Sequence, residues 1–496
     1  MTVLDELLAK GTRVAAHRPA PRTIVDATTW THAAHALADE RATLLGLWGE
    51  RDAAHMALRD GETGAIAVLS LACPDGRFPS VGARHPPAIR LERAMRDLYG
   101  LIAEGASDAR PWLDHGQWPH SRPDARAPYD FRSAEGEGLH RVLVGPVHAG
   151  IIEPGHFRFH AGGETVVRLE ERLGYVHKGI EGLMVGATLA HGAQLAGRTS
   201  GDSTVAYAIA FARATEAALV IEPPPRATWL RALMAELERL ANHFGDIGAV
   251  CNDASFGLMH AHTGVLRERV LRAADAAFGH RLMRDCVVPG GVTRDLDDKG
   301  VGAIRALVAE ARRRFPALIA LYDNTASLQD RTVGAGTLRP ELARQYGAGG
   351  YIGRASGRDF DTRRDLAYPP YNHLRFVVPR RSDGDVNARV WIRVREVEQS
   401  LDLVEQILDG LPAGATRIDL PAAVATGEGL ALAEGFRGDV LIWLRLDRDG
   451  TIARCHLRDP SWFQWPLLET AIEGNIIADF PLCNKSFNCS YSGHDL

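Results

Sequence analysis

The spacing of apolar residues changes along the chain from short runs to long helical stripes. An apolar run over residues 65–71 predicts a β-strand, and residues 89–99 have helical spacing. From residue 178 to about residue 328 the pattern becomes helical, and apolar residues recur at i, i+3 and i+4 over 230–248 and 301–319. This pattern predicts long, buried helices packed in a bundle.

Two further regions predict β structure around this helical part. Residues 141–147 and 157–169 alternate enough to form the two strands of a hairpin. The last third combines a helical stretch, 397–408, with β-type runs at 440–446 and 451–457. The expected fold class is therefore α+β, with a small N-terminal α/β domain, a mainly helical bundle core with a β-hairpin, and a mixed C-terminal part.

Composition shifts between residues 105 and 140. Four prolines lie there among arginines, glycines and aspartates, at Pro111, Pro119, Pro123 and Pro128. Such a segment is typical of a linker or an extended arm. We therefore expect a domain over 1–115, an arm over 116–140 and a second domain over 141–496, and the 496 residues leave room for two or three cores.

Composition and charge exclude several classes of protein. The chain is 46% hydrophobic and 24% charged with a net charge of −5, so it lacks the basic surplus of a nucleic-acid-binding protein. Residues 1–13 include the charged residues Asp5, Glu6 and Lys10 and do not resemble a signal peptide. A membrane-spanning helix needs about 18 consecutive apolar residues, and the uncharged apolar runs of this chain are shorter than that. A role at a membrane would therefore require docking on another subunit.

The cysteines do not form a metal-binding pattern. They lie at positions 73, 251, 286, 455, 483 and 489, and none belongs to a Cys-x-x-Cys pair. Zinc ribbons and iron–sulfur clusters held by this chain are therefore not expected, and small buried thiols in a reducing cytoplasm are the favoured interpretation. A Gly-rich phosphate loop between a strand and a helix is also missing, so we expect no NAD on this chain.

The most specific motif is found in two pieces near opposite ends of the chain. Residues 173–203 begin Leu-Gly-Tyr-Val-His-Lys-Gly-Ile-Glu and end Arg-Thr-Ser-Gly-Asp-Ser, and residues 479–495 begin Asp-Phe-Pro. This frame resembles the large subunit of [NiFe] hydrogenases, in which the two pieces end in Arg-x-Cys-Gly-x-Cys and Asp-Pro-Cys-x-x-Cys. Here Ser200 and Ser203 replace the first pair of cysteines.

The second pair of cysteine positions can be aligned in two ways. In one register the positions hold Ser490 and Gly493, and in the other they hold Cys489 and Ser492. Either way a site with four thiolates cannot be assembled. Nickel in such a centre needs soft thiolate ligands, and a serine hydroxyl is a hard donor that stays protonated near neutral pH.

Further motifs extend the resemblance over nearly the whole chain. Residues 77–119 resemble a small peripheral-arm subunit, and residues 144–496 resemble the large subunit of the complex I and energy-converting [NiFe] hydrogenase (group 4, formate hydrogenlyase-like) superfamily. The large-subunit motifs are Gly145-Pro146-x-His148, Glu153-Pro-Gly-His-Phe157, His177-Lys-Gly-Ile-Glu181, Glu236-Leu-Glu-Arg-Leu240, Arg267-Glu-Arg269, Pro289-Gly-Gly-Val292, Arg354-Ala-Ser-Gly357 and Glu434-x-x-Arg437-Gly438. The chain thus resembles a fusion of the two subunits.

The resemblance implies two kinds of catalytic site at the same place. Hydrogenases hold nickel and iron there, whereas complex I holds a quinone headgroup between the histidine of the Gly-Pro-x-His hairpin and a tyrosine. The histidine is present here as His148, but the tyrosine position falls on Gly201. The chain departs from both catalytic patterns.

Four residues are candidates for a remaining function. His148 is either a proton donor or ligand-binding residue, or a hairpin histidine satisfied by backbone. Glu181 is a proton carrier, or the partner of a buried arginine such as Arg198 or Arg437. Asp202 either titrates in a cavity or caps the Ser-rich turn. The guanidinium of Arg437 suits an anionic ligand or a carboxylate relay.

The long helix supplies weaker candidates. Glu236 and Arg239 lie on it with Glu238, Asn242 and His243, at spacings of three and four residues that allow pairing within the helix. Most such charges are solvated or structural. Because the resemblance places this face next to neighbouring subunits and polar networks, Glu236 and Arg239 are kept as functional candidates.

The leading hypothesis is an oxidoreductase subunit of the NADH dehydrogenase, quinone or hydrogenase type that is not catalytic alone. It would couple redox change at a partner iron–sulfur small subunit to membrane ion-pumping subunits, through proton-carrying groups in a cavity that a quinone could enter. The expected location is cytoplasmic, peripheral on the inner face of the cell membrane. The alternatives are a scaffold with a closed cavity and, remotely, a hydrogenase with unusual ligands.

Three expectations follow for the molecule itself. No cofactor is expected on this chain, and purified protein should carry no stoichiometric nickel. The stop at Leu496 would fit a protein without the C-terminal tail that is removed after nickel insertion. The regions around Ser200 and Ser490 should still meet in space, next to His148 and Arg437.

Overall fold

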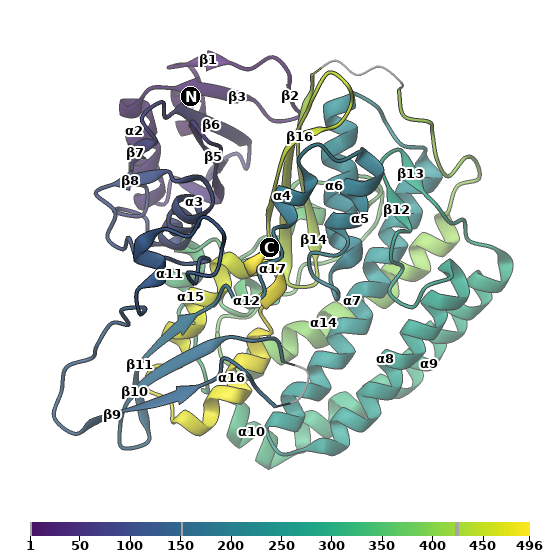
Figure 1. Ribbon diagram of the computed structural model, residues 1–496. Helices are drawn as coiled ribbons and strands as arrows, with labels where there is room; N and C mark the ends of the chain where they lie inside the picture. Colours follow the sequence, from purple (N-terminus) through teal and green to yellow (C-terminus); the bar gives the residue numbers. More distant parts are fainter. Residues whose placement is uncertain (1, 150–151, 422–425) are drawn as a thin grey trace.

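The first apolar run belongs to an N-terminal sheet. In the computed structural model, which describes residues 2–149, 152–421 and 426–496, five strands form a sheet of order β1-β3-β6-β5-β4 (Figure 1). They are β1 (Thr12–Arg13), β3 (Arg22–Val25), β4 (Ala42–Gly49), β5 (Ala53–Asp60) and β6 (Ile66–Ala72). Strands β3 and β6 are parallel, and the other pairs are antiparallel. The strand predicted at 65–71 is therefore β6.

Three helices accompany this sheet. They are α1 (Val3–Leu8), α2 (Ala27–Ala38) and α3 (Ile89–Tyr99), and the last has the bounds that its apolar spacing predicted. Helix α2 starts where the Asp26 carboxylate accepts a hydrogen bond from the Thr29 amide, and α3 ends at Gly100, whose φ of 72° favours glycine. A short parallel pair, β7 (Arg77–Pro79) with β8 (Ile102–Glu104), flanks α3.

A second sheet joins the two ends of the chain. Its order is β16-β15-β14-β2, with β2 (His17–Arg18), β14 (Glu428–Gly435), β15 (Gly438–Leu446) and β16 (Ile452–Arg458). Strand β2 runs parallel to β14. Leu45 and Trp48 of the N-terminal sheet share an apolar cluster with Leu432 and Trp443 of this one. The N-terminal region therefore packs on the C-terminal sheet through a common core.

The predicted helical part forms the main core. Figure 1 shows its long helices beside the second sheet, and one apolar cluster spans them. The elements are α4 (Ile180–Met184), α5 (Leu189–Ala196), α6 (Thr204–Leu219), α7 (Pro225–Asp253), α8 (Gly257–Phe278), β12 (Val287–Val288), β13 (Gly291–Val292), α9 (Asp298–Asn324), α10 (Ala326–Thr332), α11 (Pro340–Gln345), α12 (Gly350–Ala355), α13 (Thr362–Asp365) and α14 (Val386–Gly410). The helix predicted at 397–408 is the second half of α14.

The predicted hairpin is a three-stranded sheet. Strands β9 (Leu139–Val144), β10 (His156–Gly162) and β11 (Thr165–Arg172) pair in the order β11-β10-β9, all antiparallel. The single strand expected over 157–169 was wrong, because the chain reverses there. Gly163, with a φ of 60°, provides the left-handed backbone that such a tight turn needs.

The last residues run back through the centre of the molecule. Helices α15 (Ser461–Ala471), α16 (Phe480–Phe487) and α17 (Tyr491–Asp495) end beside α4 and the second sheet in Figure 1. The buried Asp495 carboxylate accepts hydrogen bonds from the amides of Gly174 (2.9 Å) and Val176 (3.0 Å). These bonds fix the C-terminal motif against the first one.

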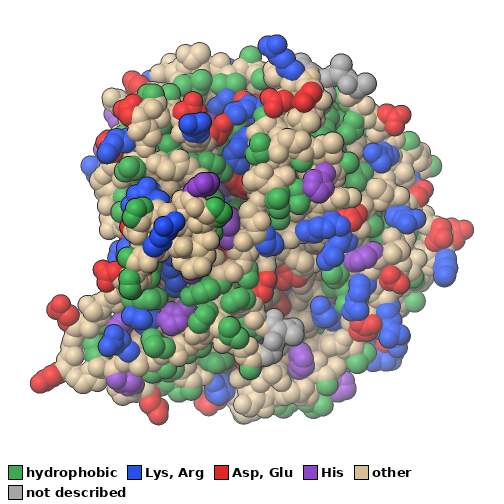
Figure 2. All heavy atoms as spheres, viewed as in Figure 1, with side chains coloured by type: hydrophobic (Ala, Val, Ile, Leu, Met, Phe, Trp, Pro, Cys, Tyr) green, Lys and Arg blue, Asp and Glu red, His purple; other side chains and the backbone are tan. Residues whose placement is uncertain are grey.

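Two surface properties bear on partners. No helix in the described ranges is both long and apolar enough to cross a membrane. Figure 2 shows acidic and basic side chains interspersed over the visible face rather than collected in one basic field. The six cysteines are free and buried, as expected for small apolar side chains.

Candidate functional site

The two pieces of the divided motif meet at the starts of two helices. Ser203 is the residue before α6, and Ser490 is the residue before α17. The Ser200 and Ser490 hydroxyl oxygens are 2.8 Å apart, within hydrogen-bonding distance. The prediction that these regions meet is therefore confirmed, whereas the hydrogen bond described for His148 goes to Gly155 and not to either serine.

An ion pair lies beside the serines. Arg437, in the turn between β14 and β15, donates to both Asp202 carboxylate oxygens at 2.7 and 2.6 Å. The Ser200 and Ser203 hydroxyls donate to Asp202 Oδ1 at 2.9 and 3.2 Å. Burial raises the pKa of Asp202, but Arg437 and the two hydroxyls outweigh it and hold this pKa below its ordinary value. The carboxylate stays charged at neutral pH, and 39% of its side chain remains exposed.

The geometry distinguishes the two registers of the second motif. Ser490 Oγ faces Ser200 and accepts a hydrogen bond from the Gly493 amide at 2.9 Å. The Ser492 hydroxyl instead donates to the carboxylate of Glu153. Because Ser490 meets the first motif, the register that places Ser490 and Gly493 at the cysteine positions is the one that the geometry supports.

The fourth position is blocked by a carboxylate. A Cβ atom on Gly493 would lie 2.3 Å from Asp459 Oδ2, which is closer than real contacts allow. Asp459 is buried, and its carboxylate accepts hydrogen bonds from the Tyr207 hydroxyl (2.7 Å) and the Ser461 amide (2.8 Å). Sequence reasoning missed Asp459, because nothing in its local pattern indicates that it reaches Gly493.

These residues do not fit a thiolate-bound nickel–iron centre. Ser200 and Ser490, which bond to each other, offer hard hydroxyl donors in place of soft thiolates, and a side chain at Gly493 would overlap Asp459. Among the described residues, no group of three or more His, Cys, Asp or Glu side chains is arranged to hold a metal.

Glu181 belongs to a separate polar cluster. Its carboxylate contacts Arg454 (2.8 Å) and His456 (2.7 Å) of β16 and accepts a hydrogen bond from Tyr99 of α3 (3.1 Å). Burial raises the pKa of Glu181, but Arg454 and His456 outweigh it and hold this pKa well below its ordinary value. Glu181 thus partners a buried arginine, but that arginine is Arg454.

The two arginines expected as alternatives have other partners. Arg198 pairs with Asp285 at 2.7 Å near the surface, and Arg437 pairs with Asp202. Neither is bonded to Glu181. The cluster around Glu181 therefore joins α4, β16 and α3 rather than the two pieces of the divided motif.

His148 contacts backbone. Its Nε2 lies 2.8 Å from the Gly155 carbonyl oxygen, and its ring packs 5.8 Å from the ring of Phe157. This contact corresponds to a hairpin histidine satisfied by backbone. At Gly201, the former tyrosine position, a Cβ would meet nothing within 4 Å, so the space for a larger side chain is open.

A cavity of about 250 Å³ opens next to Asp202, between α7 and α8. Glu238 and Asn242 bring polar groups to it, and the rest of its wall includes Leu237, Leu271 and Met283. The Glu238 carboxylate accepts hydrogen bonds from the Val205 and Ala206 amides of α6. Burial raises the pKa of Glu238 to about 8. His148, Glu181 and Arg437 do not line this cavity or the four other cavities described among residues 2–149, 152–421 and 426–496.

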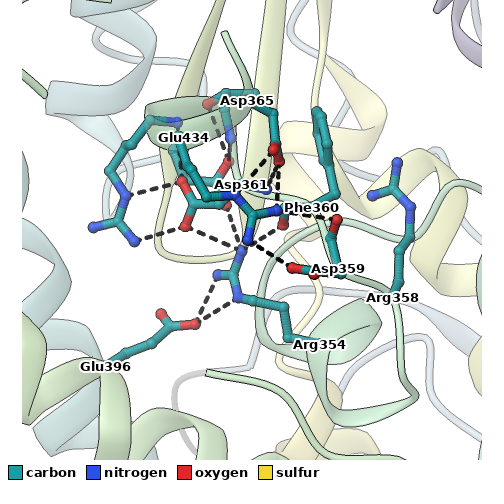
Figure 3. Close-up of polar contacts among 12 residues, drawn as sticks. Arg354, Arg358, Asp359, Phe360, Asp361, Asp365, Glu396 and Glu434 are labelled. Atoms are coloured by element: carbon teal, nitrogen blue, oxygen red, sulfur yellow. Dashed lines mark hydrogen bonds and ion pairs between the residues drawn. The ribbon is translucent and has the colours of Figure 1, made fainter. Parts of the chain in front are cut away.

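A buried charge network, part of which is drawn in Figure 3, includes Glu434 of β14 and Arg354 of α12. Arg354 contacts Glu396 at 2.7 Å, Glu434 at 3.0 Å and Asp361 at 3.3 Å. Burial, followed by the nearby Asp361, raises the pKa of Glu434 to about 7. The network as a whole contains four carboxylates and three guanidiniums, of Glu236, Asp361, Glu396, Glu434, Arg239, Arg354 and Arg363.

The weaker candidates Glu236 and Arg239 belong to this network. Arg239 also donates to the carbonyls of Glu434 (3.0 Å) and Gly435 (3.2 Å), at the start of the turn that carries Arg437. The helix pattern indicated their proximity to each other, but their partners on α13, α14 and β14 depend on the tertiary fold.

Known proteins share this architecture. The family described as "Respiratory-chain NADH dehydrogenase, 49 Kd subunit" matches residues 257–424. The chain is 32% identical to formate hydrogenlyase subunit 5 of Escherichia coli, over 84% of this chain and 77% of that protein. It is 30% identical to an NADH-quinone oxidoreductase subunit of Syntrophobacter fumaroxidans, over 71% of this chain and 95% of that protein.

A solved structure agrees with these sequence matches. A chain of the membrane-bound sulfane sulfur reductase, an archaeal respiratory membrane complex, superposes with a TM-score of 0.69 at 25% identity. The match covers 73% of this chain and 100% of that chain. With its divided motif folded together but carrying serines and glycine where hydrogenases carry cysteines, the chain belongs to the superfamily of large subunits of complex I-related and energy-converting hydrogenase complexes.

Proposed function

We propose that this chain works as the large peripheral subunit of a membrane-bound electron-transfer complex and couples redox change to a membrane arm without a nickel–iron centre. The observation that carries this proposal is the Asp202–Arg437 ion pair. It stands between the two pieces of the divided motif, with Asp202 still partly exposed beside a cavity.

The Asp202–Arg437 ion pair can change when an electron or another negative charge arrives at the site. A negative charge arriving close to Asp202 raises the pKa of that carboxylate and favours its protonation. A neutral Asp202 binds Arg437 less tightly. Because Arg239 is bonded to the same turn as Arg437, a shift of this turn changes the contacts of the buried network. The chain's own residues therefore provide a path from the site to α7 and α14.

The partners follow from the relatives. An iron–sulfur small subunit would supply the electrons, and ion-pumping subunits would receive the response, with the chain peripheral on the inner face of the cell membrane. The names of the relatives, which include a quinone oxidoreductase subunit and a membrane-bound hydrogenase subunit, support this assembly. The open space at Gly201 is where a quinone or another acceptor would approach Asp202.

The test uses the complex purified from its own membranes through a tag on this chain. Asp202→Asn should leave assembly intact and lower electron transfer coupled to ion movement by at least tenfold, while Asp285→Asn, which alters an exposed pair, should leave both unchanged. Metal analysis should find no stoichiometric nickel. About one nickel per chain with hydrogen evolution would overturn the proposal.

A scaffold role remains the second candidate. It is favoured by the separate positions of His148 and Glu181, which share no described cavity with Asp202. If Asp202→Asn leaves coupled turnover unchanged while loss of the whole chain abolishes assembly, the scaffold role replaces the coupling role.

A further inference from the structure

A second cavity lies apart from the Asp202 site. It has a volume of about 460 Å³ and is bounded by α6, the start of α7 and residues 368–373. Much of its wall is aromatic or proline, from Trp229, Tyr368, Pro369 and Tyr371. The size and the apolar lining are those of a cavity that holds a small organic molecule.

One cation in this cavity lacks a carboxylate partner. Arg213 of α6 lines the wall, donates to the Leu432 carbonyl and lies 4.0 Å from the centre of the Tyr368 ring. Among the described residues it forms no ion pair. Glu216, the acid one turn away, is already bound by Arg231 at 2.6 and 3.0 Å and by the Gly290 amide at 2.9 Å.

This arrangement leaves guanidinium donors free at an apolar wall. A guanidinium carries five N–H groups in a plane that matches a carboxylate, and only one bond of Arg213 is used within the described part of the chain. Arg213 is half-buried, and a half-buried cation without a counter-charge is partly desolvated, a cost that an anionic ligand reduces. The other acid on the lining, Glu222, is exposed, so solvent screens its charge.

We propose that the cavity at Arg213 binds an organic carboxylate, with the carboxylate on the guanidinium and the apolar body between Trp229 and Tyr371. Nothing in the proposed coupling function requires this site. The proposal rests on the cavity, its lining and the missing counter-charge.

Two walls of the cavity are bonded to the buried network. The Tyr371 hydroxyl donates to Glu236 at 2.7 Å, and the Tyr368 hydroxyl accepts from the Glu434 amide at 3.2 Å. A ligand that moves either ring therefore changes a hydrogen bond to Glu236 or to Glu434 of the buried network. The site is placed to act as a regulatory input on the same network.

The test measures binding of benzoate and of its neutral analogue benzamide to the intact protein, by ligand-observed NMR and calorimetry. Benzoate should bind at least tenfold more tightly than benzamide. Arg213→Gln should weaken benzoate binding at least tenfold, while Arg272→Gln, at an exposed arginine that does not line the cavity, should have no effect.

Equal binding of benzoate and benzamide, or unchanged benzoate binding in Arg213→Gln, would overturn the proposal. Absence of benzoate binding at millimolar concentration would also overturn it. If Arg213→Gln does not fold, the comparison of the two probes on the unmodified protein and a tenfold loss in Trp229→Ala decide the question. Failure here leaves the Asp202 experiments untouched, because they use other residues and another readout.

Discussion

Two glycines at the divided motif have opposite surroundings. Gly493 packs directly against the Asp459 carboxylate, whereas Gly201 faces open space and does not have the left-handed backbone that only glycine tolerates well. We expect Gly493→Ala to lower the free energy of unfolding by about 1–3 kcal/mol through overpacking. Gly201→Ala should be neutral or stabilising by up to about 1 kcal/mol, because alanine has less freedom in the unfolded chain.

Denaturant unfolding monitored by tryptophan fluorescence measures both changes. Gly201→Ala serves as the matched control, since it makes the same chemical change in the same site. An equal loss for both variants would mean that Asp459 does not fill the space at Gly493.

The chemistry at this scale was partly predictable. The sequence predicted that Ser200 and Ser490 would meet, because the motif frames on both sides are present. It left the register open, since a shift of one residue exchanges Ser490 for Cys489. Only the contacts with Ser200 on one side and Glu153 on the other distinguish the two.

At the scale of elements, Glu181 is the link between α4, β16 and α3. Removing it as Glu181→Ala leaves Arg454 buried without a counter-charge, so we expect a loss of about 3–5 kcal/mol in the free energy of unfolding. Asp285→Ala breaks an exposed pair whose side chains are both 41% exposed, and it should cost no more than about 1 kcal/mol. Thermal and denaturant unfolding measure both losses. If Glu181→Ala and Asp285→Ala lower the free energy of unfolding by similar amounts, a buried structural role for Glu181 is contradicted.

The buried network makes stability depend on pH. Burial and Asp361 raise the pKa of Glu434 to about 7, so between about pH 4.5 and 7 the folded state holds a proton that the unfolded state has lost. Stability should therefore fall as pH rises through this window, by about 1.4 kcal/mol per pH unit for this one group.

Glu434→Gln should remove that part of the slope. The exposed Glu268, changed to Gln, is the matched control and should leave the slope as it is. The measurement is urea unfolding at several pH values from 4.5 to 8. Identical slopes in Glu434→Gln and the unmodified protein would show that Glu434 is charged throughout.

Regular elements were the easier part of the fold to predict. Strands β6, β15 and β16 follow from their short, nearly continuous apolar runs, which are buried on both faces, and α3 follows from its helical spacing. The division of β10 from β11 was missed, since the two glycines at the turn lie inside an alternating pattern. The network partners of Arg239 were also out of reach, because they come from helices far away in sequence.

At the scale of the whole molecule, the N-terminal region is tied to the rest by shared apolar cores. Trp112 of the region packs in one cluster with Phe157 and Trp462, and Trp48 packs with Trp443 in another. The proposed division at residue 115 therefore separates the five-stranded sheet from the β9–β11 sheet. The apolar cluster that contains Trp112 includes residues from both sides of it. The boundary remains a prediction that proteolysis can test.

We expect protease to cut in the exposed stretch 135–138 of the arm and the two pieces to stay together. The nicked protein should elute at its original volume in gel filtration and separate only in denaturant. A free N-terminal piece of about 115 residues that remains folded would show instead that the region is an independent domain.

The pairing of β2 with β14 has a consequence for how the protein is made. The buried Arg22–Glu428 ion pair beside these strands joins residues 406 positions apart. At a synthesis rate of about 5–20 residues per second, Arg22 is added to the chain about 20–80 s before Glu428. Throughout that interval the nascent N-terminal sheet keeps an uncovered apolar face and a solvated guanidinium. Chaperone demand during translation should therefore end only when the last third of the chain emerges.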